Sequence, residues 1–232
     1  MRSTVMRMSS LTLIWLVTLI LPLALGLWAQ RKVKTTFEHY SQVPVRSGMT
    51  GAQAAAAVIR TSGLPDVEIR GVEGRLTDHY DPRSRTLNLS PDVGQASTVA
   101  ALGVAAHEAG HAIQDSRGYL PMRVRQTFVP VAQIGSSLAI PVIFGGLLLN
   151  IAGLTTLGLA LFTAIVIFQL VTLPVEFDAS KRALVALNDG RLLEADELTG
   201  AKKVLDAAAW TYVAALVASV SQLIYFFLAS RR

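Results

Sequence analysis

His107 and His111 stand four positions apart in an alanine-rich stretch, and Glu108 directly follows the first of them. On an α-helix, residues four positions apart lie on one face, one turn above the other, so both imidazoles can bind one zinc ion per chain. Glu108 is rotated off this row and can reach a water molecule beside the metal. Because zinc lowers the pKa of bound water to about 7, the pattern predicts peptide-bond hydrolysis with Glu108 as general base.

A catalytic zinc ion needs a third protein ligand besides this pair. The chain has four histidines and no cysteine, and neither His39 nor His79 stands in a ligand-like context. A carboxylate is therefore expected, and Glu176 follows the end of an apolar run by three residues. From the pattern alone, Glu176 is equally well interpreted as a solvated glutamate at a membrane boundary. Because half of all the histidines stand in the motif, two ordinary core or surface histidines are the less favoured interpretation of the pair.

The composition indicates a membrane protein. Of 232 residues, 52% are hydrophobic and 16% charged, which is more apolar than an ordinary soluble domain. The absence of cysteine excludes disulfides and any cysteine-based metal or nucleophile site. The net charge of +5 comes from scattered Lys and Arg residues that flank apolar runs, as expected beside anionic lipid. Nucleic acid is therefore not an expected partner.

The first apolar run, within residues 10–30, has about the length of a helix that crosses a bilayer. A cleaved signal peptide is the alternative, because Arg2 and Arg7 precede the run and Ala24 to Gly26 resembles a cleavage site. The basic segment that starts at Arg31 favours a retained anchor.

Three further spans are expected at residues 128–150, 151–173 and 208–229, with a hairpin turn near Asn150 to Gly153. Two polar segments remain, 31–127 and 174–207, and they share one side of the membrane because two crossings separate them. The positive-inside rule places both in the cytoplasm of a multi-pass plasma-membrane protein. The basic residues that favour this side are Arg31, Lys32, Lys34, Arg123, Arg125, Lys181, Arg182, Lys202 and Lys203, and those that oppose it are Arg2, Arg7, Arg231 and Arg232.

The first polar segment predicts a small α+β domain. Thr50 can cap a short helix that runs to about Arg60, with Gly63 at its end. Residues 67–72 and 86–89 alternate apolar with polar side chains, as half-buried strands do, and 81–84 form a turn between them. The strand at 86–89 is expected to pair with an extended substrate. A helix over about 97–114 carries the His-Glu motif, and Gly110 inside it suggests a close approach, although simple tolerance is equally consistent.

Several stretches, in the same order, resemble the YugP-type neutral zinc metallopeptidases. They read Y-S-Q-V-P-V-R-S-G-M-T-G from Tyr40, L-T-D-H-Y-D-P from Leu76, A-A-H-E-A-G-H-A-I-Q around the motif and L-P-V-E-F-D-A-S-K-R-A around Glu176. The resemblance implies a zincin-like fold with Glu176 as the third ligand. In the more distantly similar HtpX and CAAX-type membrane proteases, an Asp four residues after that Glu supports a zinc-bound His. Ser180 stands there in this chain, so Ser180 or Asp178 is the candidate for that supporting role.

A group that stabilises the oxyanion is also expected, and His79, Tyr80 and Tyr119 are the candidates with suitable donors. His79 is equally consistent with an ordinary surface loop.

The combined expectation is an α-helical integral membrane protein with four transmembrane helices and a small zincin-like α+β domain that contains the motif helix. Its expected activity is that of a zinc-dependent endopeptidase acting on membrane or membrane-adjacent proteins. The alternative is a membrane adaptor that keeps the zinc site but has little turnover. Expected partners are membrane lipid, a protein or peptide substrate, and a membrane protein or a second copy of the chain.

Overall fold

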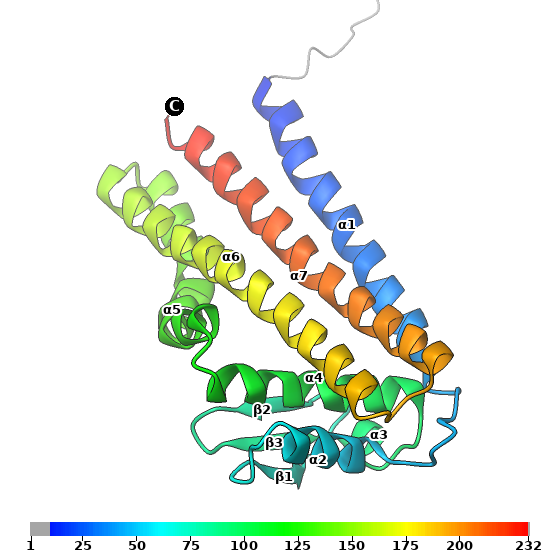
Figure 1. The fold of residues 1–232 in the computed structure, drawn as a ribbon. Helices are drawn as coiled ribbons and strands as arrows, with labels where there is room; N and C mark the ends of the chain where they lie inside the picture. The colour runs from blue at the N-terminus through cyan, green and yellow to red at the C-terminus, as the bar shows by residue number, and fades with distance from the viewer. Residues whose placement is uncertain (1–9, 232) are drawn as a thin grey trace, which may run out of the picture. The chain divides into compact units, whose positions relative to one another are not determined.

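The computed structural model describes residues 10–231, with side chains from residue 16 onward. Arg2, Arg7 and Arg232, which entered the charge comparison above, lie outside the described residues. This part of the chain forms seven helices and three strands, which are labelled in Figure 1. They are α1 (Ser10–Tyr40), α2 (Gly51–Thr61), β1 (Glu68–Gly71), β2 (His79–Asp81), β3 (Thr86–Leu89), α3 (Pro91–Gly94), α4 (Val99–Ser116), α5 (Leu120–Leu148), α6 (Ala152–Asp189) and α7 (Ala195–Ala229).

The chain forms two compact units. One, here called the apolar unit, comprises Met1–Trp28, Thr127–Leu170 and Tyr212–Arg232. The other, here called the polar unit, comprises Ala29–Gln126 and Val171–Thr211. All residues of the candidate site belong to the polar unit.

Among the described residues, four helices are long and apolar enough to cross a membrane, the same number as the spans expected from the sequence. They are Leu16–Tyr40, Leu120–Leu148, Ala152–Asp189 and Ala195–Ala229. Many of their large apolar side chains face outward, including Leu21 at 63% and Leu148 at 84% exposure. Lipid-facing helices require such an apolar surface.

The apolar unit depends on a close hairpin of α5 and α6. A Cβ atom at Gly146 would collide with the backbone nitrogen of Thr155, and one at Gly158 would lie 2.7 Å from that of Ile143. Small residues let helices in a membrane approach this closely. The expected turn is confirmed by Asn150, which has φ 55°, a left-handed conformation that Asn tolerates.

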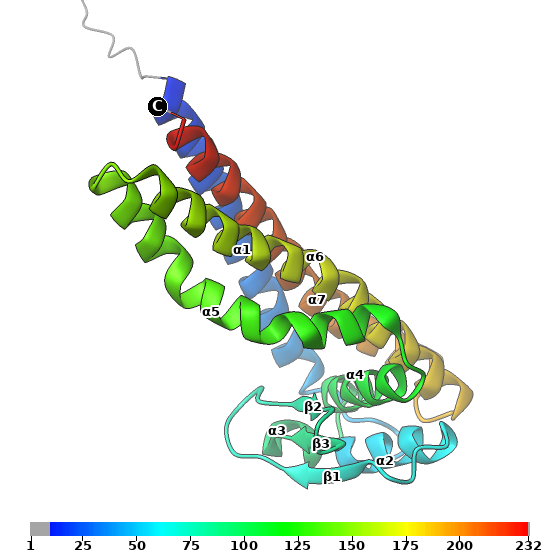
Figure 2. The ribbon, with the colours of Figure 1, turned by 90° about the vertical axis from the view of Figure 1, so that its left-hand side faces the viewer.

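The sheet of the polar unit has the order β1-β3-β2, as the two ribbon views show (Figures 1 and 2). β3 pairs in parallel with β1 and antiparallel with β2. Strands at 67–72 and 86–89 were expected and are confirmed as β1 and β3. The three-residue strand β2 was not expected, because it is too short to show alternation. The expected pairing of 86–89 with a substrate was wrong, because β3 is the central strand and β1 and β2 occupy both its edges.

Two helices of the polar unit begin at side-chain caps. The Thr50 hydroxyl accepts a hydrogen bond from Gln53 N, and the Gln53 side chain accepts one from Thr50 N, which confirms the predicted cap of α2. The start expected for α4, Ser97, is two residues too early. Thr98 caps this helix by accepting from Ala101 N, whereas Ser97 donates its hydroxyl to Gly48 O.

Alanine-rich α4 lies in the core of the polar unit. Its first turn is almost fully buried, and Val99 and Leu102 are both at 0% exposure. They belong to the same buried cluster as Val58 of α2, Leu87 of β3 and Leu187 of α6. The helix that carries the histidines therefore packs against α2 and β3 and also against α6.

Candidate metal centre

The two histidines of α4 present their rings side by side. The ring centroids of His107 and His111 are 4.8 Å apart, with an angle of 82° between the planes. This arrangement follows from their spacing of one helical turn on a helix whose backbone is capped and buried. His111 is buried and His107 is partly buried.

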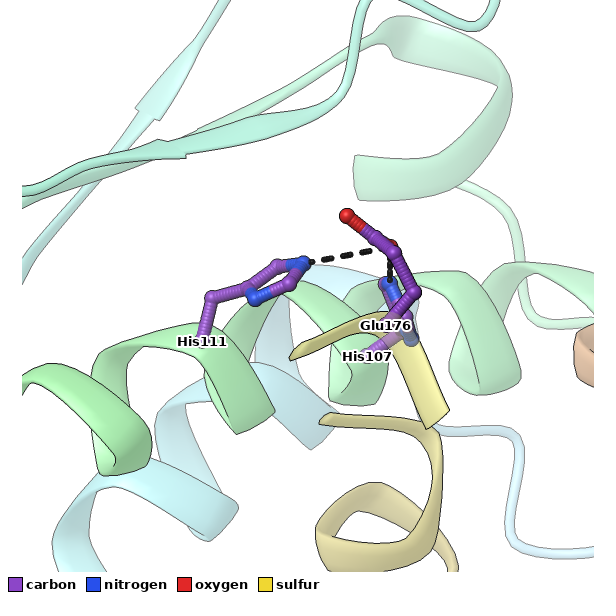
Figure 3. Close-up of side chains that lie close together, drawn as sticks. All are labelled: His107, His111 and Glu176. Carbon is purple, nitrogen blue, oxygen red and sulfur yellow. Dashed lines mark hydrogen bonds and ion pairs between the residues drawn. The ribbon is translucent and has the colours of Figure 1, made fainter. Parts of the chain in front are cut away.

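Glu176 of α6 brings a carboxylate to this pair from a distant part of the chain (Figure 3). Its Oε2 atom lies 3.2 Å from His107 Nε2 and 3.6 Å from His111 Nε2. One ligand atom from each of the three residues lies within 4.8 Å of the others. Two imidazole nitrogens and one carboxylate oxygen are a donor set that zinc accepts, so these residues fit the ion that the motif predicts.

The electrostatics of the site favour a positive charge among these atoms. Burial by itself lowers the pKa of His111. The hydrogen bond with Glu176 and the negative charges of Glu108 and Glu176 outweigh burial, so the pKa is raised above its ordinary value. The same negative charges would attract a metal cation to this position.

Gly110 allows α6 to lie against α4 at the site. A Cβ atom at this position would lie 2.5 Å from the carbonyl oxygen of Ala179, a distance that real Cβ atoms do not reach. The close approach considered for Gly110 is therefore confirmed, and the neighbouring element is α6. A side chain at position 110 would push α6, and Glu176 with it, away from the histidines.

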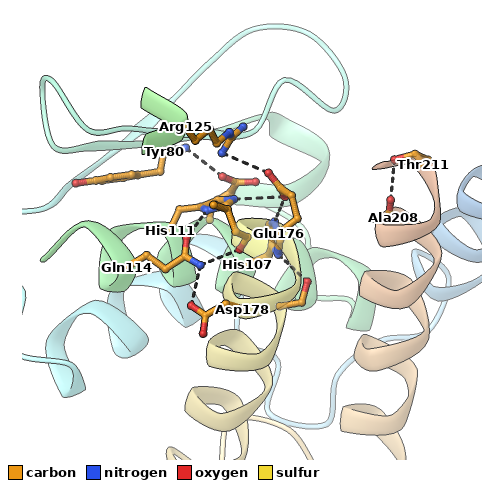
Figure 4. Close-up of polar contacts among 12 residues, drawn as sticks. Tyr80, His107, His111, Gln114, Arg125, Glu176, Asp178, Ala208 and Thr211 are labelled. Carbon is orange, nitrogen blue, oxygen red and sulfur yellow. Dashed lines mark hydrogen bonds and ion pairs between the residues drawn. The ribbon is translucent and has the colours of Figure 1, made fainter. Parts of the chain in front are cut away.

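Buried hydrogen bonds orient the ring of His111 (Figure 4). Gln114, which is 0% exposed, donates its amide N–H groups to Val175 O and to Asp178 Oδ2, each at 2.8 Å. Its Oε1 atom must then accept from His111 Nδ1, which lies 3.0 Å away. This fixes a proton on Nδ1, so Nε2, on the side of Glu176, is the nitrogen that gives up its proton when the ring binds a metal.

His107 is oriented by a different residue. Its Nδ1 atom lies 3.1 Å from the hydroxyl oxygen of Ser180. Of the two supporting residues that the sequence left open, Ser180 contacts His107 directly, whereas Asp178 reaches His111 through Gln114. Arg182 in turn donates to Asp178 from one turn farther along α6.

Glu108 is held beside the proposed metal ligands His107, His111 and Glu176 by the backbone of β2. The Tyr80 N–H donates to Glu108 Oε2 at 3.0 Å. The Tyr80 phenol points elsewhere and donates to Asp115 Oδ2 at 3.0 Å. Burial and this hydrogen bond raise the pKa of Tyr80, so the phenol keeps its proton at any physiological pH. Tyr80 therefore meets Glu108 through its main chain and not through its hydroxyl group.

Comparison with known proteins agrees with this geometry. Residues 15–231 match the family described as "putative neutral zinc metallopeptidase". The chain belongs to this family. A curated relative, "Putative membrane protease YugP" of Bacillus subtilis (strain 168), is 45% identical over 204 residues, which cover 88% of this chain and 91% of the relative. No solved structure matches the chain. The resemblance to YugP-type metallopeptidases that the sequence motifs indicated is thereby confirmed.

His79 and Tyr119, the other two candidate oxyanion donors, have partners away from the proposed metal ligands. His79 is exposed, with Nδ1 2.8 Å from Thr77 O and Nε2 3.2 Å from the Asn88 amide. The Tyr119 ring packs under the guanidinium of Arg182, whose Cζ atom lies 5.6 Å from the ring centroid. Neither side chain is directed to the histidine pair by these contacts.

Sequence reasoning missed Gln114 and Arg125 as residues of the site. Gln114 is three positions after His111 in a helix of buried alanines, and an amide at such a position signals a buried partner. Arg125, 3.3 Å from Glu176 Oε1, was interpreted only as one of many basic residues near span ends. No local pattern distinguishes it from them, because its partner is far along the chain.

Proposed function

We propose that the chain is a membrane-bound, zinc-dependent endopeptidase that hydrolyses peptide bonds of membrane or membrane-adjacent proteins. The observation that carries this proposal is the meeting of His107, His111 and Glu176 ligand atoms within 4.8 Å. Glu108, held beside them by Tyr80 N, supplies the carboxylate that hydrolysis needs. A structural zinc site is usually closed by four ligands and has no use for this extra carboxylate, so the adaptor alternative is not favoured.

In this proposal the residues of the chain divide the chemistry between them. Zinc, when bound, lowers the pKa of water to about 7 and polarises the carbonyl group of the peptide bond. Glu108 accepts the proton of the attacking water and passes it to the nitrogen of the leaving amine. Because Tyr80 N occupies Oε2 of Glu108, the other oxygen is the one that takes the proton. Gln114 and Ser180 keep both imidazoles turned with Nε2 toward Glu176.

Removal of the metal tests this function directly. Treatment of the purified, detergent-solubilised protein with 1,10-phenanthroline is expected to abolish its cleavage of casein or of a membrane protein substrate. Addition of one equivalent of zinc to the dialysed protein should restore cleavage, because residues 16–231 contain one group of three such ligands. Metal content by mass spectrometry is measured on the same samples. Full cleavage by metal-free protein would refute the proposed function.

We also propose that the site lies at the cytoplasmic surface of the plasma membrane. Glu176 follows the apolar run of α6 by three residues on the same helix, and both polar segments carry the larger share of basic residues near span ends. A site at that level would meet substrates that are themselves in or beside the bilayer. This supports membrane and membrane-adjacent proteins as the substrate class.

Single cysteines can test this orientation, because the chain has no cysteine of its own. Arg83→Cys lies in the first polar segment and Ala152→Cys at the start of α6, and both positions are exposed. In intact cells, a membrane-impermeant maleimide is expected to label Ala152→Cys and to label Arg83→Cys only after permeabilisation. The reverse pattern would place the metal centre on the outer side.

A further inference from the structure

The two oxygens of the Glu176 carboxylate face different partners. Oε2 is the atom near both imidazoles, at 3.2 Å from His107 Nε2 and 3.6 Å from His111 Nε2. Oε1 forms an ion pair with Nη1 of Arg125 at 3.3 Å. The Glu176 side chain is 3% exposed and that of Arg125 is 28% exposed. Because the pair is largely shielded from water, salt screens it less than it screens an exposed pair.

Arg125 comes from the beginning of α5, a third element besides α4 and α6. In Figure 4 its guanidinium reaches Glu176 from the side on which Tyr80 lies, whereas Gln114 and Asp178 lie on the other side. A guanidinium stays charged at every physiological pH, so this contact does not depend on a proton. Both oxygens of the Glu176 carboxylate therefore have partners: Oε2 faces the imidazoles, and Oε1 contacts Arg125.

Whether a metal site can catalyse hydrolysis depends on how many oxygens of its carboxylate ligand bind the metal. A carboxylate can bind through one oxygen or through both. A catalytic zinc site needs three protein ligand groups and one open position, and binding through both oxygens would fill a further position. An Oε1 atom that is engaged by a cation is not available for the metal.

We infer that Arg125 is a positioning residue that restricts Glu176 to metal binding through Oε2 and so keeps a coordination position open for water. This inference rests on the zinc site of the proposed function. It assigns to Arg125 a role in the geometry of the metal centre and no contact with the substrate.

Cobalt(II) in place of zinc provides the test, because its visible absorption weakens when the coordination number rises from four to five. Cobalt-loaded Arg125→Gln is expected to show this weaker spectrum while still binding one metal ion per chain. Arg125→Lys keeps a cation near Oε1 and should restore much of the wild-type spectrum. Arg123→Gln removes the same charge from an exposed position on the same helix and should leave the spectrum unchanged. Cleavage by zinc-loaded Arg125→Gln should fall about 10- to 100-fold, the usual effect of removing a partner of a metal ligand.

A wild-type cobalt spectrum in Arg125→Gln would overturn the inference. A rise in KM with that unchanged spectrum would also overturn it, because it would assign Arg125 to substrate binding. If the wild-type protein itself binds no metal, the proposed function fails, and the inference about Arg125 fails with it. If the wild type binds metal and Arg125→Gln shows the same spectrum, only the inference about Arg125 fails. If Arg125→Gln does not fold, Arg125→Met, which also removes the charge but keeps an unbranched side chain of similar length, takes its place, and a wild-type cobalt spectrum in Arg125→Met would equally overturn the inference.

Discussion

Glu108→Gln is expected to keep the fold and the bound zinc while it lowers cleavage of casein or a membrane substrate by roughly two to four orders of magnitude. The amide oxygen of Gln can still accept the hydrogen bond from Tyr80 N, which now holds Glu108 at 3.0 Å. An amide cannot take a proton from water at neutral pH, so the general base is lost and the geometry is retained. Steady-state cleavage rates are measured beside zinc content.

The matched control is Glu73→Gln, the same change at an exposed glutamate of the polar unit. It should cleave like the wild type, which separates the effect at Glu108 from a general loss of negative charge. Undiminished cleavage by zinc-loaded Glu108→Gln would rule out the proton transfer proposed here, whatever the metal content of the protein.

Glu176→Ala is expected to lose most of its zinc. It removes one of the three ligand groups that the described residues bring together, and with it the negative charge beside the imidazoles. Partners outside the ligand shell already change metal affinity by about 10- to 100-fold, so loss of a ligand itself should exceed about 100-fold. Zinc per chain is measured by mass spectrometry after dialysis, and affinity by competition with a chelating dye.

Two further variants serve as controls for the loss of zinc from Glu176→Ala. Asp189→Ala removes an exposed carboxylate at the end of the same helix and should bind zinc normally. Glu176→Gln keeps the volume of the buried side chain and should also lose affinity, which distinguishes loss of the ligand from loss of packing. If Glu176→Ala retained one tightly bound zinc ion, the third ligand would have to be another residue.

The two variants give different patterns because the residues act at different steps. Glu108→Gln should separate metal binding from catalysis, whereas Glu176→Ala should abolish both. A membrane adaptor with a structural zinc site would give no cleavage for Glu108→Gln to diminish. The pair of variants therefore distinguishes the endopeptidase from the adaptor without knowledge of the natural substrate.

Local features of the fold could be predicted because their causes are local. The capping of α2 by Thr50 involves groups three residues apart, and the hairpin turn at Asn150 depends on the lengths of two apolar runs. The pairing of β3 with both β1 and β2 could not be predicted, since β2 has three residues and its partner is chosen by packing. The error about the substrate-binding strand has the same origin.

The sequence by itself determined that two imidazoles and the carboxylate of Glu108 share one stretch of helix, because the helical repeat alone brings His107 and His111 to one face. Only the tertiary structure decided which oxygen of Glu176 faces them, and that Gln114 and Arg125 complete the site. These contacts join α4, α5 and α6, and they form only where Gly110 lets α6 pack against α4. Such approaches depend on the packing of segments that are distant in sequence, and no local pattern of residues encodes them.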